Sequence, residues 1–261
     1  MDSKLGFAIS GSFCTFQRVL KEIRGLVEAG ADIVPILSFN AAALDTRFQT
    51  AEDFRRELTA ITGHEPLTTL AEVEPIGPKG LFDALVVAPC TGTTLGRLAN
   101  GLSDNPVSLA VKSHLRRSRP VILAVSTNDA LGASMRNIAL LKNAKNIYFV
   151  PMRQDDAVNK PNSLVADFAR REDTIQAALS GMQLQPLFVY QQHRLSKNGN
   201  PPFGKQKSGG GLPIGVCEDM CLANTPYRRK PAETHVFPPV FKSRGGTGGD
   251  RWNKANVSEP P

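Results

Sequence analysis

The fold is decided by the stretch Ala84-Leu-Val-Val-Ala-Pro-Cys-Thr-Gly-Thr-Thr-Leu-Gly-Arg-Leu-Ala-Asn-Gly101. Its first five residues are all apolar, which is typical of a strand that is covered on both faces of a parallel sheet. A turn rich in small and hydroxyl side chains follows and leads directly into a helix, which we predict over residues 93–99. A buried strand that feeds a helix through such a turn is the first half of a βαβ unit.

The same pattern recurs on both sides of this stretch. Apolar side chains recur at helical spacing between Phe16 and Val27 and predict a helix, which ends at Gly30. Pro35 lies in the strand predicted after this helix and indicates that this strand is at an edge of the sheet. The five predicted strands are Lys4–Ser10, Asp32–Leu37, Ala84–Ala88, Val121–Val125 and Ile147–Val150. Further helices are predicted over residues 51–61, 106–117, 130–143 and 163–179. This alternation predicts a Rossmann-like, three-layer α/β fold with a parallel sheet of at least five strands.

The C-terminal part of the chain differs in composition. Residues 189–261 hold ten of the 22 glycines and nine of the 19 prolines, and they show neither helical nor strand periodicity. Such a segment buries too little apolar surface to offset the entropy of ordering it. We therefore expect one folded domain over residues 1–188, followed by a disordered, basic, Gly/Pro-rich tail over residues 189–261.

Charge and cysteine content exclude several classes of function. The tail carries 11 of the 31 Lys and Arg residues and 5 of the 24 Asp and Glu residues, which gives it +6 of the total charge of +7. The first 188 residues are therefore nearly neutral, and we expect no nucleic-acid partner for them. We find no run near the roughly 20 apolar residues that span a bilayer and no signal-peptide pattern, so we expect a cytoplasmic protein without a membrane partner. Cys14, Cys90, Cys217 and Cys221 lack paired CxxC spacing and are interpreted as reduced thiols, with no metal site.

Turns with hydroxyl side chains follow four of the predicted strands, and the carboxyl ends of parallel strands meet at one edge of a sheet. Taken alone, the turn after the first strand could be ordinary helix capping and the one after the second strand an ordinary turn. Their convergence favours a site for a phosphate-bearing ligand, because helix N-termini attract anions. The first turn lacks the GxGxxG motif, which counts against the pyrophosphate of NAD there. The four turns are Ser10–Ser12, Ser38–Asn40, Pro89–Thr94 and Ser126–Asp129.

Several of these motifs resemble those of the flavin-dependent cysteine-decarboxylase-like flavoproteins. The resemblance rests on Ser10-Gly-Ser12, Ala88-Pro-Cys-Thr-Gly-Thr-Thr94, Leu98-Ala-Asn-Gly101 and Asp104. Within that superfamily, the chain is similar to the B subunits of dipicolinate synthase over about residues 4–188. This closer similarity rests on Pro89-Cys-Thr-Gly92, Glu74–Lys79, Ser126–Gly132, Lys145–Pro151 and Lys160–Val165.

The resemblance implies a flavodoxin-like fold, bound FMN and a homo-oligomer. It implies a flavoprotein of spore-forming bacteria that acts during sporulation with the A subunit of dipicolinate synthase. The pair would oxidise a small dicarboxylate, dihydrodipicolinate, to dipicolinate (pyridine-2,6-dicarboxylate), with NADP bound by the A subunit. By motif, the implied cofactor-binding residues are Ser10, Gly11, Ser12, Ser38, Cys90, Thr91, Gly92, Thr93, Thr94, Ser126, Thr127 and Asn128.

Two alternatives stay open at this stage. One is another FMN-dependent enzyme of the superfamily, a decarboxylase or a prenyltransferase, and the other is a non-catalytic FMN-binding partner subunit. The resemblance implies an active-site histidine shortly before the third strand in the decarboxylases, whereas the nearest here, His64, lies about twenty residues earlier, so we expect no decarboxylation. A catalytic residue is not assigned, and we interpret Cys14 and Cys90 as small buried residues rather than as redox thiols. Basic candidates for binding a dianionic substrate are Arg136, Lys142, Arg153 and Lys160.

Overall fold

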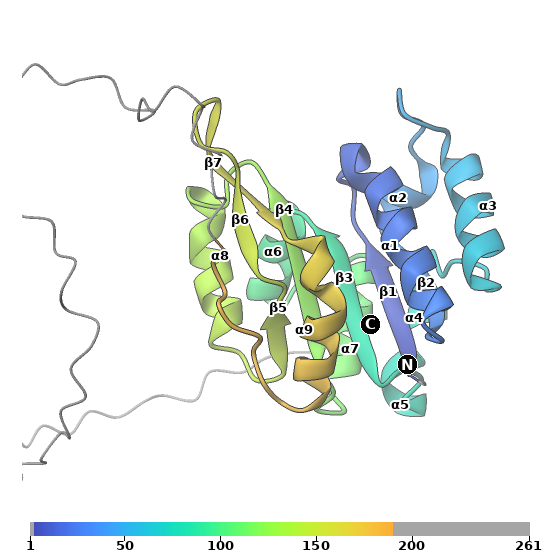
Figure 1. Cartoon of the computed structure of the whole chain (residues 1–261). Helices are drawn as coiled ribbons and strands as arrows, with labels where there is room; N and C mark the ends of the chain where they lie inside the picture. The colour runs from blue at the N-terminus through green and yellow to red at the C-terminus, as the bar shows by residue number, and fades with distance from the viewer. Residues whose placement is uncertain (1–2, 190–261) are drawn as a thin grey trace, which may run out of the picture. The chain divides into compact units, whose positions relative to one another are not determined.

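The computed structural model in Figure 1 describes residues 3–189. The tail predicted to be disordered lies outside the described residues, apart from Val189, so this prediction and the domain boundary stay predictions. Within the described range, no helix combines the length and apolar character that crossing a bilayer requires.

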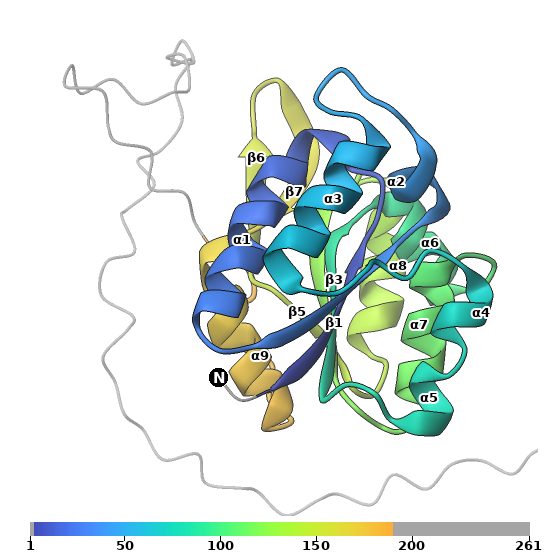
Figure 2. The ribbon, with the colours of Figure 1, turned by 90° about the vertical axis from the view of Figure 1, so that its right-hand side faces the viewer.

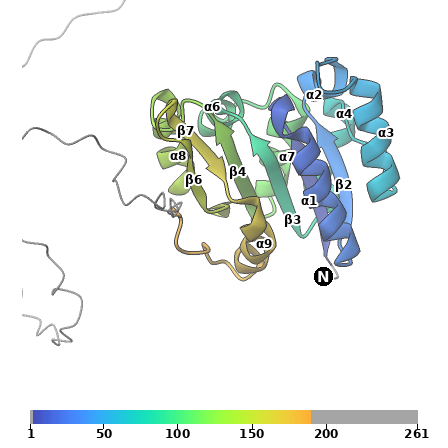
Figure 3. The same ribbon diagram turned by 45° about the horizontal axis from the view of Figure 1, so that its top comes forward.

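A seven-stranded mixed sheet forms the middle layer, in the order β2-β1-β3-β4-β7-β6, with β5 also paired to β4. Strands β1 to β5 are parallel, which confirms the predicted parallel sheet, and β2 lies at an edge, as Pro35 indicated. Figure 3 shows β4, β7 and β6 side by side. The strands are β1 (Lys4–Ile9), β2 (Asp32–Leu37), β3 (Ala84–Cys90), β4 (Val121–Thr127), β5 (Ile147–Phe149), β6 (Met152–Asp156) and β7 (Lys160–Ala166).

Helices cover both faces of the sheet (Figure 2). One face is covered by α1 (Phe16–Glu28), α3 (Ala51–Thr62) and α9 (Arg171–Leu179), together with the short α2 (Phe39–Ala43). The other face is covered by α4 (Leu70–Val73), α5 (Ile76–Lys79), α6 (Gly92–Ala99), α7 (Pro106–Leu115) and α8 (Ala133–Lys142). Two 3-10 turns, Phe13–Thr15 and Phe168–Arg170, precede α1 and α9.

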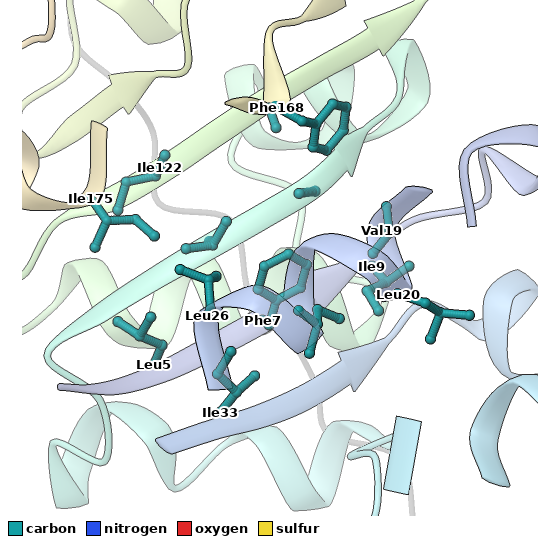
Figure 4. Close-up of a cluster of buried hydrophobic side chains, with 14 of the residues drawn as sticks. Leu5, Phe7, Ile9, Val19, Leu20, Leu26, Ile33, Ile122, Phe168 and Ile175 are labelled. Atoms are coloured by element: carbon teal, nitrogen blue, oxygen red, sulfur yellow. The ribbon is translucent and has the colours of Figure 1, made fainter. Parts of the chain in front are cut away.

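The core follows from the alternation of side chains along the strands. In β1, Leu5, Phe7 and Ile9 point to the face covered by α1, while Ala8 points to the opposite face. Figure 4 shows the first of these two clusters, in which the β1 side chains lie against Val19 and other residues of α1. Because both faces are buried, each central strand is a continuous apolar run, as the sequence indicated.

The helix predicted over residues 163–179 is wrong in its first half. Residues up to Ala166 belong to β7, and the helix occupies only Arg171–Leu179. β7 pairs antiparallel with β4, with Val165 opposite Ser126, so pairing with a distant strand outweighs local helical spacing. The sequence also did not predict β6, α4 or α5, and the turn at Ser38 proves to be the N-cap of α2.

Candidate functional site

The loops after β1 and β3 are joined through the hydroxyl of Ser10. This residue is buried, and its hydroxyl donates a 2.6 Å hydrogen bond to the carbonyl oxygen of Pro89. The amide nitrogen of Thr91 donates a 3.2 Å hydrogen bond to the same hydroxyl oxygen. One buried side chain thus satisfies two backbone groups of the β3 loop and holds both strand ends together at the carboxyl edge of the sheet.

The β3 loop ends at the N-terminus of α6, where Thr91 is the N-cap. The Thr91 hydroxyl oxygen accepts a 3.3 Å hydrogen bond from the amide nitrogen of Thr94, and the two hydroxyls lie 3.1 Å apart. Other amides of the first turn of an α-helix have no acceptor within the helix, and the helix dipole places partial positive charge there. This end of α6 can therefore bind an anion such as a phosphate.

The loop after β2 reaches the same place. The amide nitrogen of Ser38 donates a 3.0 Å hydrogen bond to the carbonyl oxygen of Ile9, and the Ser38 hydroxyl oxygen accepts one of 3.3 Å from the amide nitrogen of Ala41. The loops together enclose a cavity of about 200 Å³, which we call the small cavity. Its lining residues are Ser10, Gly11, Ser38, Phe39, Asn40, Thr91, Thr93, Thr94, Arg97 and Asn105.

A second cavity of about 770 Å³, which we call the large cavity, lies next to the first. The two share Gly11, Thr91 and Thr93 in their linings, so the loops after β1 and β3 separate them. In the large cavity the hydroxyl oxygens of Ser12 and Ser126 lie 3.5 Å apart, which brings the β1 and β4 loops together. Pockets of about 300–1,000 Å³ are typical for cofactors and small molecules, so the large cavity has the size of a ligand site.

The β4 loop forms one wall of the large cavity around Asp129. Its carboxylate accepts hydrogen bonds of 2.9 and 3.0 Å from the Ser134 hydroxyl and one of 2.5 Å from the Thr127 hydroxyl. A Cβ atom on Gly92 would lie only 2.8–2.9 Å from oxygens of these three side chains. Glycine at this position therefore lets the start of α6 pack directly against the β4 loop.

The hairpin of β6 and β7 forms another part of the large cavity. Thr127 pairs with Leu164 and Ser126 with Val165, so β7 continues the sheet beside the carboxyl end of β4. This register brings Ser163 to the cavity, together with Lys160 and Asp155, whose charged groups lie 3.0 Å apart. The hairpin therefore adds one ion pair to the cavity.

Arg18 lines the large cavity and was not predicted as a site residue. It lies in the first turn of α1, and its guanidinium carbon lies 4.7 Å from the centroid of the Phe168 ring. The signal available in the sequence was its place in the first turn of the helix that follows Ser10–Ser12. A residue there faces the sheet edge to which the hydroxyl-rich turns also point.

Eleven of the twelve predicted site residues line one or both cavities, and Cys90 lines neither. The Cys90 side chain is buried in the cluster beneath α6 and α7, and burial raises the pKa of its thiol. A register shift between Val87 and Cys90 turns the side chain to that face of the sheet. Any contact of this residue with a ligand would have to come from its backbone.

Other sequence candidates are also placed by the structure. Of the four basic candidates for substrate binding, Lys160 lines the large cavity, whereas Arg136, Lys142 and Arg153 do not line either cavity. His64 lies outside both cavities, and its Nε2 atom is 2.7 Å from the carboxylate of Asp32 at the amino end of β2. It therefore lies at the edge of the sheet opposite the site.

Comparison with known proteins adds to this geometry. The model of the family described as Flavoprotein matches residues 2–179 of the chain. The B subunit of dipicolinate synthase from Bacillus subtilis (strain 168) is 41% identical over 186 residues, which cover 71% of this chain and 93% of that protein.

Solved structures give the same relationship. The crystal structure of the B subunit of dipicolinate synthase from Bacillus halodurans C matches with a TM-score of 0.67 and 39% identity, over 72% of this chain and 96% of that one. The structure of HAL3 from Cryptococcus neoformans matches with a TM-score of 0.51 and 17% identity, over 68% of this chain and 96% of that one. At this lower identity, the likeness to HAL3 concerns the fold alone.

Proposed function

Because the chain belongs to the flavoprotein family and, within it, groups with the B subunits of dipicolinate synthase, we propose that it is the FMN-binding subunit of such an enzyme. Together with the partner A subunit, it would oxidise dihydrodipicolinate to dipicolinate, which removes one hydride and one proton and makes the ring aromatic. The observation that carries this proposal is the convergence of four strand-end loops on two adjoining cavities.

The small cavity fits the phosphate of FMN. Thr91, Thr93 and Thr94 offer hydroxyls at the start of α6, and Ser10 and Ser38 lie across from them. The amides of Thr91 and Thr94 already donate within the loop and the cap, so the amide of Thr93 is the one of these three that would meet a phosphate. Hydroxyls and helix N-termini are the usual partners of a phosphate that lacks a strong cationic ligand. Arg97 also lines this cavity, but its charge is paired with Asp104 at 2.8 Å.

The large cavity fits the ring of the flavin and, beside it, a small substrate. Gly11, Thr91 and Thr93 border both cavities, so a ligand anchored by its phosphate in one can extend into the other. Bound flavin supplies two-electron redox chemistry at this place. The chain contributes polar side chains from the loops after β1 and β4, among them Ser12 and Ser126, which would orient the ring edge.

Binding of the cofactor is tested by titrating the full-length chain with FMN and with riboflavin, which lacks the phosphate, and following flavin absorption and fluorescence. We expect saturable binding of FMN and weaker binding of riboflavin. Thr91→Val removes the cap hydroxyl and should weaken FMN more than riboflavin. Equal affinities for FMN and riboflavin in both proteins would contradict a phosphate site at α6.

Whether this chain takes part in catalysis is tested by measuring dihydrodipicolinate oxidation with this chain alone, with the partner A subunit alone, and with both together. Activity only in the mixture supports the proposed two-component enzyme. Full activity of the isolated A subunit would make this chain a non-catalytic partner, and full activity of this chain alone would remove the need for that partner. Release of carbon dioxide would instead indicate a decarboxylase.

Two further expectations belong to this proposal. Nicotinamide binding is assigned to the A subunit, so NADP should leave the flavin spectrum of this chain unchanged. The chain is also expected to form a homo-oligomer, which light scattering of the purified protein measures. A monomer at all concentrations would contradict the second expectation and leave the flavin site untouched.

A further inference from the structure

The guanidinium of Arg18, an exposed side chain, lies over an aromatic ring rather than beside an acid. It lies over Phe168, 4.7 Å from the ring centroid, and it lines the large cavity. Phe168 itself is fully buried in the cluster between the sheet and α1 (Figure 4), so it is a fixed platform. A cation on an aromatic face is attracted by the ring, yet all of its N–H donors remain available for a ligand.

Other cations of the two cavities are already paired. Lys160 lies 3.0 Å from Asp155 and Arg97 lies 2.8 Å from Asp104, whereas none of the carboxylates in residues 3–189 lies within ion-pair distance of Arg18. Of the basic side chains that line either cavity, Arg18 is therefore the one whose charge is not neutralised by a described neighbour. An anionic ligand would gain most from contact with this residue.

Two opposite walls of the large cavity carry side chains of opposite charge. Arg18 enters from α1, which covers one face of the sheet, whereas Asp129 enters from the loop that packs against α6 on the other face. The carboxylate of Asp129 is held in place by the hydroxyls of Thr127 and Ser134. A negatively charged group in the cavity would be repelled from the Asp129 wall and attracted to the Arg18 wall.

We propose that Arg18 is the substrate-binding residue that selects for a carboxylate: its guanidinium binds one carboxylate of the dicarboxylate substrate. This inference rests on the proposed function and adds to it the residue that recognises the substrate. A planar guanidinium matches a carboxylate with two parallel hydrogen bonds, which a lysine at the same place would not reproduce. Lys160, already paired with Asp155, contributes less.

Arg18 is assigned to the substrate and not to the phosphate of FMN. The phosphate site at the start of α6 belongs to the small cavity, whose lining does not include Arg18. Substitution of Arg18 should therefore change the affinity for a carboxylate ligand and leave the affinity for FMN unchanged. The affinity for a carboxylate ligand therefore tests the inference about Arg18, whereas the affinity for FMN tests the proposed function on which it rests.

The experiment is a calorimetric titration of the full-length chain, with and without FMN, using pyridine-2,6-dicarboxylate as the probe. We compare wild type with Arg18→Gln, Arg18→Lys and the control Arg47→Gln. Arg47 is a matched control because its guanidinium also lies over a ring, 4.8 Å from the centroid of Phe48, but it lines neither cavity. The uncharged pyridine-2,6-dicarboxamide is titrated in parallel.

Charge-assisted hydrogen bonds predict that Arg18→Gln weakens binding of the dicarboxylate by about 10- to 100-fold. Arg18→Lys should fall between this variant and wild type, and Arg47→Gln should bind as wild type does. The dicarboxamide should show no difference between wild type and Arg18→Gln. FMN affinity should be the same in all four proteins.

Three results would overturn the inference: equal dicarboxylate affinity of Arg18→Gln and wild type, a loss of FMN affinity in Arg18→Gln, or no dicarboxylate binding by an FMN-loaded wild-type chain. The last result would leave the FMN-binding proposal intact. If FMN binds to none of the proteins, the cofactor proposal fails, and the titration without FMN still decides whether Arg18 recognises a carboxylate.

Discussion

Ser10 and Pro89 are 79 residues apart in the sequence, and the hydroxyl of Ser10 donates a 2.6 Å hydrogen bond to the carbonyl oxygen of Pro89. The same hydroxyl accepts a hydrogen bond from the amide of Thr91, the N-cap of α6. The geometry of the cavity edge therefore depends on one buried hydroxyl group. Local sequence gives no sign of this contact, because it connects the ends of two different strands.

Ser10→Ala should lower both the stability of the protein and its affinity for FMN. It leaves the carbonyl of Pro89 and the amide of Thr91 without their partner, which costs about 1–3 kcal/mol for buried groups. Urea denaturation of the full-length chain measures the free energy of unfolding, and FMN titration measures the affinity. The control is Ser180→Ala at an exposed helix end, and equal behaviour of the two variants would contradict the structural role of Ser10.

Gly92→Ala should weaken flavin binding, whereas Gly96→Ala in the same helix should not. The added Cβ at Gly92 would lie 2.8–2.9 Å from three side-chain oxygens of the β4 loop, so either that loop or the start of α6 must move. At Gly96 the nearest atom would be the side-chain nitrogen of Asn137 at 3.6 Å, an ordinary contact. Alanine favours a helix over glycine by about 1 kcal/mol, so Gly96→Ala should be neutral or stabilising.

FMN titration and thermal unfolding of both glycine variants provide the measurement. Overpacking typically costs about 1–3 kcal/mol, and a shift of about 1.4 kcal/mol in binding corresponds to a tenfold change in affinity. If Gly92→Ala binds FMN as tightly as Gly96→Ala does, the contact between the β4 loop and α6 has no part in the cofactor site.

The sequence predicted the parallel part of the sheet because each of its strands is a local apolar run followed by a turn. It did not predict β7, since Lys160–Ala166 becomes a strand by pairing with the distant β4, in addition to the adjacent β6, and not by its own alternation. Residues whose pairing partners lie far along the chain carry only a weak local signal. The wrong helix over residues 163–170 has this cause.

In the candidate site, too, some features could be predicted from short stretches of sequence, whereas others depend on contacts that the local sequence does not reveal. The hydroxyl-rich turns could be predicted because the carboxyl ends of parallel strands meet at one edge. The direction of the Cys90 side chain, into the cluster beneath α6 and α7, could not be predicted, because it follows from a register shift in β3 that simple alternation does not reveal. The contact of Arg18 with Phe168 could not be predicted either, because Phe168 lies far along the chain, in the 3-10 turn after β7.

Cys14 and Cys90 should differ sharply in their reactivity. Cys14 is exposed and lines the large cavity, so its interpretation as a buried residue is wrong. Cys90 is fully buried, as predicted, and the pKa of its thiol is raised by that burial. Since the thiolate is the reactive form, a brief treatment with a maleimide should modify Cys14 and spare Cys90. Peptide mass mapping gives the extent of labelling at each site.

Ligand protection makes the cysteine experiment a test of the cavity as well. Bound FMN should slow the labelling of Cys14, because that side chain lines the large cavity. Denaturation before labelling should expose Cys90 and make the two thiols react alike. Rapid labelling of Cys90 in the native protein would contradict its burial in the cluster beneath α6 and α7.

His114 should make the stability of the protein depend on pH between about 4 and 6.5. Burial lowers the pKa of this histidine from 6.5 to about 4 in the folded protein, despite a hydrogen-bond contact of 3.2 Å between Nε2 and the carbonyl oxygen of Pro120. Between these values the unfolded chain binds more protons than the folded one. The free energy of unfolding should therefore fall as the pH falls from about 6.5 to 4, by about 3 kcal/mol at most, and change little above that range.

The measurement compares urea denaturation of wild type and His114→Gln across this pH range. Glutamine keeps a side-chain amide that can donate to the Pro120 carbonyl, but it does not take up a proton. The carboxylates of Asp32 and Glu72, whose pKa values are lowered by their hydrogen bonds, also lose stabilisation in acid, and they do so equally in both proteins. The slope of stability against pH should thus be shallower in His114→Gln, and parallel curves would show that His114 accepts a proton in the folded protein as readily as in the unfolded chain.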